Sequence, residues 1–105
     1  MLLNEICITE AREPYQIKEK NKFKKGFKKH KHNKKVIKQL KIIKSYFAKG
    51  ELPPNTPPFK NHKLTDMGGL YDVHVDGNQI IMTYTIDGNI INLEGLGSHR
   101  ELGVQ

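Results

Sequence analysis

The sequence predicts an α+β fold in which two N-terminal helices pack on a small, mostly antiparallel β-sheet. The first half of the chain spaces its apolar residues as helices do, four prolines interrupt the middle, and the second half alternates apolar and polar residues between glycine-containing turns. With 105 residues the chain has the size of one domain. We expect that domain over residues 15–105, after a leader over 1–14 to which the sequence assigns no role.

Two helices are expected in the first half. In the first helix, Phe23 and Phe27 lie four residues apart on one side, and Asn21 is the expected N-cap. The apolar residues of the second helix repeat with helical spacing at Val36, Leu40, Ile43 and Phe47. Asn33 is the expected N-cap of this second helix, and Gly50 is its stop signal. We interpret the pair as an antiparallel hairpin with one apolar face and one lysine-rich face.

The second half is expected to form a meander of strands. Prolines exclude regular structure over residues 52–59, which connect the helices to the sheet. The main strands are expected over 70–75, 80–86 and 89–95. Asp87-Gly88, between the last two, is a typical two-residue hairpin turn. Because side chains alternate along a strand, Asp72 and His74 should share one face of the sheet.

The N-terminal residues and the cysteine content exclude several classes of protein. A single cysteine, Cys7, excludes an internal disulfide and a cysteine-rich zinc module. No apolar run approaches the roughly 20 residues that cross a bilayer, and the first ten residues lack a basic segment, so neither a membrane span nor a secretory signal is expected. We therefore expect a cytoplasmic protein. Short strands are compatible with the alternation around Ile6 and Ile8 and with residues 15–18.

Charge is divided unevenly between the two halves. Residues 15–49 hold 14 lysines and one acid, whereas residues 66–105 hold six acids and one arginine. Lysine arrays bind phosphate backbones without reading sequence, so nucleic acid is the first partner to expect. The candidate contacts are Lys22, Lys25, Lys28, Lys29, Lys31, Lys34 and Lys35. A solvated face that serves solubility, or one that docks an acidic protein, is the alternative interpretation.

Histidines are the candidates for chemistry. Of the five in the chain, His30 and His32 lie in the lysine-rich part and are expected to be exposed. His62, His74 and His99 fall near the predicted sheet, and Asp72 projects beside His74, where a carboxylate can orient an imidazole. The alternative interpretation is that Asp72 and His74 only form the polar outer face of a half-buried strand, which would give the same sequence pattern. Scattered histidines without a cysteine pair are a weak zinc signal, so no metal is expected.

Metal-free RNA cleavage is a reaction to which such residues are suited. The ribose 2′-OH attacks the adjacent phosphate, so a base must accept its proton, an acid must protonate the departing 5′-oxygen, and a cation must neutralise the charge that develops. Histidine, with an ordinary pKa of about 6.5, can be base or acid at neutral pH. Composition alone does not select this reaction.

Several motifs together indicate a family. Its elements are a proline-rich connector, a His-x-Leu, an Asp-x-His strand, a tyrosine in the next strand and a Leu-Gly-Ser-His-x-x-Leu ending. They stand here as Leu52-Pro-Pro, His62-Lys63-Leu64, Asp72-Val73-His74, Tyr84 and Leu96–Leu102. In this pattern the chain resembles the RelE/ParE toxin superfamily, and its YafQ branch in particular, over roughly 15–102.

The resemblance implies a RelE-like fold and a concrete activity. Such toxins are endoribonucleases that cut messenger RNA in the ribosomal A site without a metal or other cofactor, and a cognate antitoxin silences them. The catalytic residues would fall on His62, Asp72, His74 and His99, with His62 and His99 transferring protons while Asp72 and His74 position or polarise the reacting groups. Tyr84 and Arg100 join the lysines as expected RNA contacts.

The chain departs from the family pattern at four positions, which keep two alternatives open. Asn78 replaces an acid, Thr85 and Gly95 replace arginines, and Gly103 replaces an aromatic residue. Arginine binds phosphate in a bidentate manner that lysine does not reproduce. One alternative is therefore a relative that binds RNA or ribosomes without cutting. The other is a ParE-like inhibitor of DNA gyrase, although such proteins do not use this histidine set.

Overall fold

The structure is a computed structural model that describes residues 13–65 and 67–104. The strand considered around Ile6 and Ile8 lies outside these residues. The elements in chain order are β1 (Gln16–Glu19), α2 (Asn21–His30), α3 (Lys34–Ala48), β2 (His62–Lys63), β3 (Tyr71–Asp76), β4 (Ile80–Asp87), β5 (Ile90–Gly97) and α4 (His99–Leu102). None of the helices in this part of the chain has the length and hydrophobicity that a membrane-spanning segment needs.

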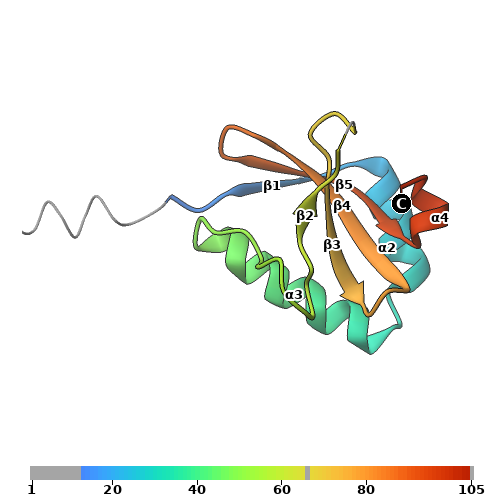
Figure 1. The fold of residues 1–105 in the computed structure, drawn as a ribbon. Coiled ribbons are helices and arrows are strands. Elements are labelled where there is room, and N and C mark those ends of the chain that lie inside the picture. The colour runs from blue at the N-terminus through green and yellow to red at the C-terminus, as the bar shows by residue number, and fades with distance from the viewer. Residues whose placement is uncertain (1–12, 66, 105) are drawn as a thin grey trace, which may run out of the picture.

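The strands form one mixed sheet in the order β1-β5-β4-β3-β2 (Figure 1). β1 runs parallel to β5, and the other three pairings are antiparallel. β1, which precedes the two helices, and β2, which follows them, are the edge strands. The centre of the sheet is the β3-β4-β5 meander. The predicted α+β fold with a mostly antiparallel sheet is confirmed.

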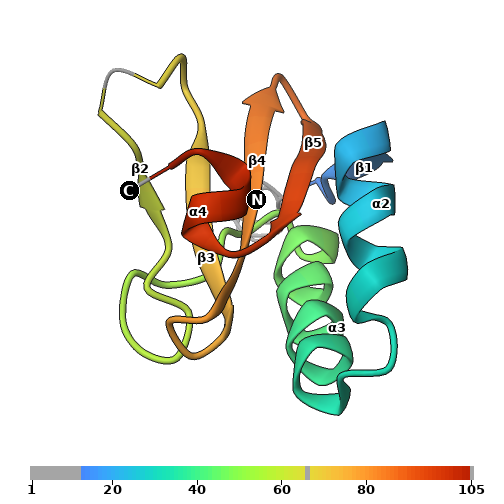
Figure 2. The same ribbon diagram turned by 90° about the vertical axis from the view of Figure 1, so that its right-hand side faces the viewer.

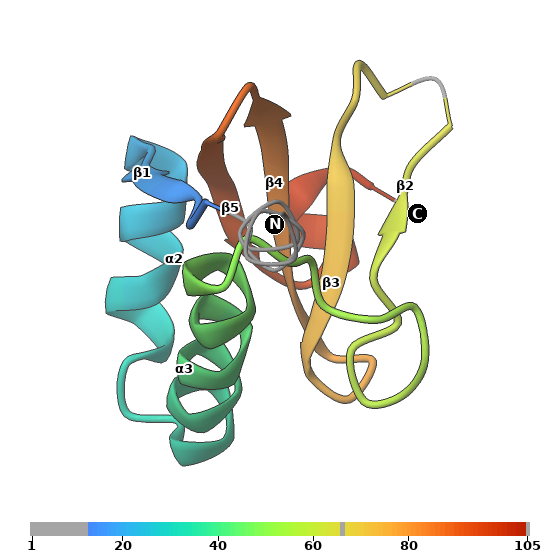
Figure 3. The ribbon, with the colours of Figure 1, turned by 90° about the vertical axis from the view of Figure 1, so that its left-hand side faces the viewer.

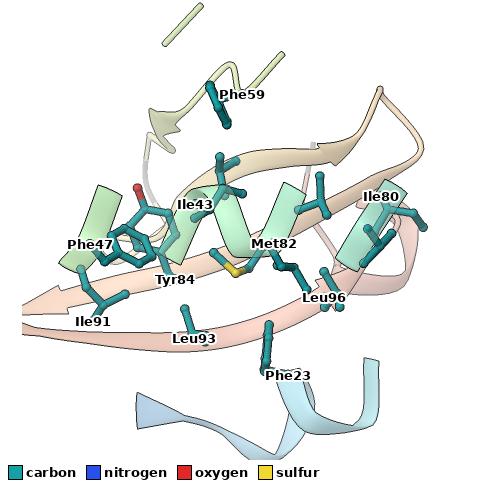
Figure 4. Close-up of a cluster of buried hydrophobic side chains, with 14 residues drawn as sticks. Phe23, Ile43, Phe47, Phe59, Ile80, Met82, Tyr84, Ile91, Leu93 and Leu96 are labelled. Carbon is teal, nitrogen blue, oxygen red and sulfur yellow. The ribbon is translucent and has the colours of Figure 1, made fainter. Parts of the chain in front are cut away.

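α2 and α3 cover one face of the sheet, and the core lies between them and the strands (Figures 2 and 3). The predicted apolar stripe of α3 is buried, from Val36 at 0% exposed to Leu40 at 4%. Phe23 of α2 joins the same core, where it lies near Leu96 of β5 (Figure 4). α2 packs mainly on β5 and α3 on β3. α2 and α3 run antiparallel on either side of the short turn at residues 31–33, so the predicted helical hairpin is confirmed, although each helix packs more on the sheet than on the other helix (Figures 2 and 3).

Gly26 explains how α2 comes so close to the sheet. A Cβ atom at this position would lie 2.0 Å from the carbonyl oxygen of Leu96. That distance is far below van der Waals contact, and the obstacle is backbone rather than a movable side chain. Glycine lowers helix propensity, yet only glycine lets the helix pack this near to β5.

The helix ends are set by local hydrogen bonds. Asn33 is the N-cap of α3, as predicted, and its side chain accepts from the backbone N–H groups of Lys35 and Val36. Asn21 is not the cap of α2, because Lys20 occupies that position and Asn21 is the first helical residue. A lysine side chain has no acceptor, so this helix begins without a side-chain cap.

The proline-rich connector has no helix or strand before β2, as predicted, and Phe59 attaches it to α3 and to β3. Phe59 is buried, with its ring 5.5 Å from that of Tyr46 in an edge-to-face arrangement. The backbone N–H of His74 donates to the Phe59 carbonyl at 2.7 Å. These contacts fix the path of the chain just before His62.

Candidate active site

Sheet register brings three of the four predicted catalytic residues together. Asp72 and His74 are two apart on β3 and point away from the helices, because the intervening Val73 is fully buried in the core. α4 follows β5 and carries His99 to the same face of the sheet, opposite α2 and α3 (Figure 2). The expectation that Asp72, His74 and His99 lie close together is thus met by the geometry.

Distances within this trio are short. His99 Nε2 lies 3.2 Å from Asp72 Oδ2, and His74 Nε2 lies 3.9 Å from Asp72 Oδ1. The two imidazole rings are 5.8 Å apart between centroids and meet edge to face. Asp72 is 0% exposed, whereas the His99 side chain is 31% exposed and faces solvent. A buried carboxylate thus supports one accessible imidazole and one nearly buried imidazole.

The Asp72 carboxylate is underbonded. Both of its oxygens are buried, and neither accepts an aligned hydrogen bond from the part of the chain that the structure describes, although His99 Nε2 is near. A buried charge without hydrogen bonds is costly, so residues of this kind are usually retained for a role in chemistry or binding. Asp72 is the group in the site that most requires a positive partner.

His62 lies on the same face but outside the trio. It is the direct cross-strand partner of Asp72 in the β2–β3 pair, so both side chains leave the sheet on one side. Its Nδ1 lies 3.0 Å from the carbonyl oxygen of Lys60, which indicates an N–H donor there, and Nε2 has no hydrogen-bond partner among the described residues. The exposed ring borders a surface hollow of about 530 Å³ that Val104 and Met67 also line.

The position of His99 at the start of α4 depends on contacts that the family motif does not indicate. Ser98 is its N-cap and forms a capping box with Glu101, and the Glu101 carboxylate also contacts the Lys29 ammonium of α2. Lys29 and the Ser98 backbone lower the pKa of Glu101 from its ordinary 4.5 to about 2. Ser-x-x-Glu is a known capping signature, so Ser98 and Glu101 could have been identified from sequence.

The lysines of α2 fall on two flanks. Lys22, Lys25 and Lys29 repeat at a helical spacing, so they share the flank that reaches α4 through the Lys29–Glu101 contact. Lys28 and Lys31 fall on the other flank by the same periodicity. Lys34 and Lys35 begin α3, and Lys35 lines a separate hollow with Asp76 and Gly77. Arg100 is exposed and directly follows His99.

Tyr84 is placed where it cannot contact RNA. It is 0% exposed and lies on the helix side of the sheet, packed against Phe47 and Tyr71 with ring centroids 5.3 and 5.1 Å away. Its hydroxyl donates to Asn61 Oδ1 at 2.5 Å, and burial raises its pKa. The expected RNA contact is therefore wrong. Tyr84 instead holds Asn61, the residue before His62.

The departures from the family pattern have local explanations at two positions. A Cβ atom at Gly95 would lie 2.9 Å from Leu102 Cδ2 and 3.2 Å from Thr83 Oγ1, so the side chain of α4 occupies the space beside β5. Thr85 donates its hydroxyl to Glu94 at 3.0 Å on the neighbouring strand. Neither position supplies a cation. The basic residues placed nearest the predicted catalytic residues are Lys63, directly after His62, and Arg100, directly after His99.

Comparison with known proteins agrees with this arrangement. Residues 15–104 match the family model described as the bacterial toxin of type II toxin-antitoxin system, YafQ. No curated protein sequence matches the chain significantly.

Solved structures share the fold. A chain of the Escherichia coli DinJ-YafQ complex is 26% identical with a TM-score of 0.68, covering 84% of this chain and 97% of that one. The metal-bound structure of a toxin from Helicobacter pylori is 27% identical with a TM-score of 0.70, covering 84% and 98%. The YoeB dimer from Staphylococcus aureus, at 24% identity and a TM-score of 0.62 over 81% and 97%, is similar in fold.

The family match extends over nearly the whole described chain and includes the Asp-x-His strand and the Gly-Ser-His ending, whose side chains the structure brings into contact. The chain belongs to the YafQ family of bacterial toxins from type II toxin-antitoxin systems.

Proposed function

We propose that the protein is a ribosome-dependent endoribonuclease that cuts messenger RNA in the ribosomal A site. The observation that supports this most is the contact of His99 with the buried Asp72, beside His74 and one strand away from His62. Two accessible imidazoles on one face are what a paired acid and base require.

In the proposed reaction, one imidazole accepts the 2′-OH proton as the 2′-oxygen attacks phosphorus. The bond from phosphorus to the 5′-oxygen then breaks, and a second imidazole protonates that oxygen. His62 and His99 fit these two roles, because the His62 ring is exposed, the His99 ring is partly exposed, and each has a ring nitrogen facing solvent or the site. Asp72 orients His99, and His74 packs edge to face against the His99 ring.

Phosphate contacts are proposed on the α2 flank and on α4. Lys29 contacts α4, where Arg100 follows His99, and Lys22 and Lys25 share the Lys29 flank by helical spacing, so the backbone of a bound RNA can run along this side of α2. The remaining lysines on the α2–α3 segment extend this positive surface and can contact ribosomal RNA. We also propose a cytoplasmic location, where ribosomes are found.

A cognate antitoxin is the proposed protein partner. The comparison with the E. coli complex supports this, since YafQ is held there with DinJ. The exposed lysines of α2 and α3 are complementary to an acidic polypeptide, which could cover the same surface as RNA.

The test is to induce the protein in bacteria and map the 5′ ends of messenger RNA. We expect in-frame cuts that disappear with His99→Ala, while His32→Ala, an exposed residue outside the site, retains them. Purified protein should cut little free RNA without ribosomes, and robust cutting there would contradict ribosome dependence.

A relative that binds without cutting is favoured by one observation, the absence of arginine at Thr85 and Gly95. Intact messages together with ribosome binding would support that reading. Growth arrest with intact messages and a damaged chromosome would instead indicate a gyrase inhibitor.

A further inference from the structure

We infer that Asp72, His74 and His99 form a binding site for a divalent transition-metal ion such as Zn²⁺, and that the bound ion silences the nuclease. Binding follows from the geometry of the three residues alone. Silencing rests on the proposed function, because it supposes that these residues carry out RNA cleavage.

The spacing of the donor atoms suits a metal. One donor atom from each residue lies within 4.8 Å of the other two. Two ligands that each lie about 2.0 Å from zinc at a tetrahedral angle are about 3.3 Å apart. The 3.2 Å between His99 Nε2 and Asp72 Oδ2 matches this separation. His74 Nε2, at 3.9 Å from Asp72 Oδ1, needs only a small side-chain adjustment.

Burial and charge favour a cation at this point. Both Asp72 oxygens are buried and lack an aligned hydrogen bond from the described residues, so a positive ion would compensate a charge that is otherwise poorly compensated. The His99 side chain is 31% exposed, so one of the three ligands can be reached from solvent.

The donor set selects the kind of ion. Two imidazoles and one carboxylate are the ligands of many zinc sites, and imidazole also suits Cu²⁺. Mg²⁺ and Ca²⁺ prefer sites made wholly of oxygen ligands, so neither should compete at similar concentration.

A bound ion would block the reaction directly. It would occupy the His99 lone pair that proton transfer requires and the carboxylate oxygen that orients this ring. The active form of the proposed nuclease is then the metal-free form, and the metal acts as an inhibitor rather than a cofactor.

Binding is tested by titrating EDTA-treated, dialysed full-length protein with ZnCl₂ in a calorimeter, and with Co²⁺ to record the visible absorption of a tetrahedral site. We expect one ion per chain and at least a tenfold loss of affinity in His74→Ala, His99→Ala and Asp72→Asn. His32→Ala and His62→Ala, outside the trio, should bind as the wild type does. Circular dichroism verifies that each variant is folded. Absence of Zn²⁺ binding by the wild type, or equal binding by all variants, would overturn the inference.

Silencing is tested on programmed ribosomes, with the protein alone, with saturating Zn²⁺, and with Zn²⁺ followed by EDTA. At least a tenfold inhibition that EDTA reverses supports the inference, and undiminished cleavage by the zinc-loaded protein overturns silencing. If the metal-free protein binds Zn²⁺ but cuts nothing, the proposed function fails while the metal site stands.

Discussion

At the scale of single residues, Asp72 combines a cost in stability with a proposed role in function. Its carboxylate is buried without an aligned hydrogen bond from the described residues, yet it lies 3.2 Å from the imidazole that it is proposed to orient. Groups that are arranged for chemistry in this way are commonly unfavourable for folding.

Asp72→Asn keeps the shape and removes the charge. We expect messenger RNA cleavage to fall about 100-fold, in line with the loss of a group that orients a catalytic histidine. The free energy of unfolding should stay unchanged or rise by about 1 kcal/mol, because a buried unpartnered charge is removed. Cleavage rates and urea unfolding measure the two effects. Asp87→Asn, in an exposed hairpin, should alter neither, and a strongly destabilised Asp72→Asn would show that the carboxylate is well compensated after all.

Gly26 shows how one residue can be required for packing rather than chemistry. Gly26→Ala should lower the free energy of unfolding by about 2 kcal/mol, because a clash with the rigid Leu96 carbonyl should cost the upper end of the roughly 1–3 kcal/mol that is typical of overpacking. Alanine's better helix propensity, about 1 kcal/mol, offsets only part of this loss. Thermal denaturation provides the measurement. The exposed Lys28→Ala on the same helix is the control, and a stabilised Gly26→Ala would contradict the close packing of α2 on β5.

At the scale of elements, α4 is a four-residue helix that is stabilised by its N-cap and by one contact with α2. A helix this short has little stability of its own, so the Ser98–Glu101 capping box and the Lys29 contact determine where His99 lies.

Ser98→Ala should therefore destabilise the fold by about 1 kcal/mol, the usual cost of removing an N-cap. It should also reduce cleavage, because His99 loses its fixed position relative to Asp72. Unfolding curves and single-turnover cleavage report the two effects. Ser45→Ala, an exposed serine within α3, is the control. Full activity in Ser98→Ala would indicate that substrate binding alone can position His99.

Glu101 adds a pH dependence to the same element. Its folded-state pKa is lowered to about 2, chiefly by Lys29, so its stabilising contribution is present above about pH 4.5 and is lost as the pH falls toward 2. The contribution is small because the pair is exposed to solvent. Comparing the pH dependence of unfolding in wild type and Glu101→Gln isolates it. The difference between the two proteins should shrink on acidification over this range, and a difference that stays constant would exclude the ionised pair as its source.

At the scale of the whole molecule, the lysines of α2 and those of α3 lie on different parts of the surface. Lys29 of α2 contacts Glu101 of α4, the helix that carries His99, and Lys22 and Lys25 share its flank by helical spacing. Lys41 and Lys44 of α3 lie elsewhere, with Lys44 beside Glu19 of β1.

This arrangement predicts which lysines bind RNA. In a His99→Ala background that prevents cleavage, Lys22→Gln with Lys25→Gln should weaken binding of a single-stranded RNA and lower its log–log salt slope by about 1.4, or about 0.7 for each lost phosphate contact. Lys41→Gln with Lys44→Gln removes the same charge and should change the slope much less. Fluorescence anisotropy over a range of salt concentrations measures the affinity and the slope. Equal changes in slope for the two double variants would indicate that the positive charge attracts RNA diffusely and not along a defined path.

Local patterns in the sequence predict much of this molecule. Strand alternation correctly placed Asp72 and His74 on one face, and the Asn33 cap and the apolar stripe of α3 follow from short-range rules. The burial of Tyr84 was also accessible, since it shares the alternation of Ile80 and Met82, but the family motif suggested a contact with RNA instead.

Long-range pairings were less accessible. The parallel pairing of β1 with β5 joins segments separated by two helices, and the His62–Asp72 register depends on the path of an irregular connector. The close packing at Gly26 and the folding of α4 over Gly95 likewise depend on surfaces that meet only in three dimensions. The sequence therefore predicted the elements and the faces of their side chains more reliably than it predicted how distant elements are packed together.

The bond between Tyr84 and Asn61 has a consequence for any protein that captures this toxin. It connects a ring in the middle of the core to the residue directly before the edge strand β2. An inhibitor that displaced β2 from the sheet would first have to break the buried hydrogen bond between Tyr84 and Asn61. An inhibitor that binds over the exposed side of the histidines breaks no buried hydrogen bond. We therefore expect inactivation by steric occlusion of the site rather than by displacement of β2.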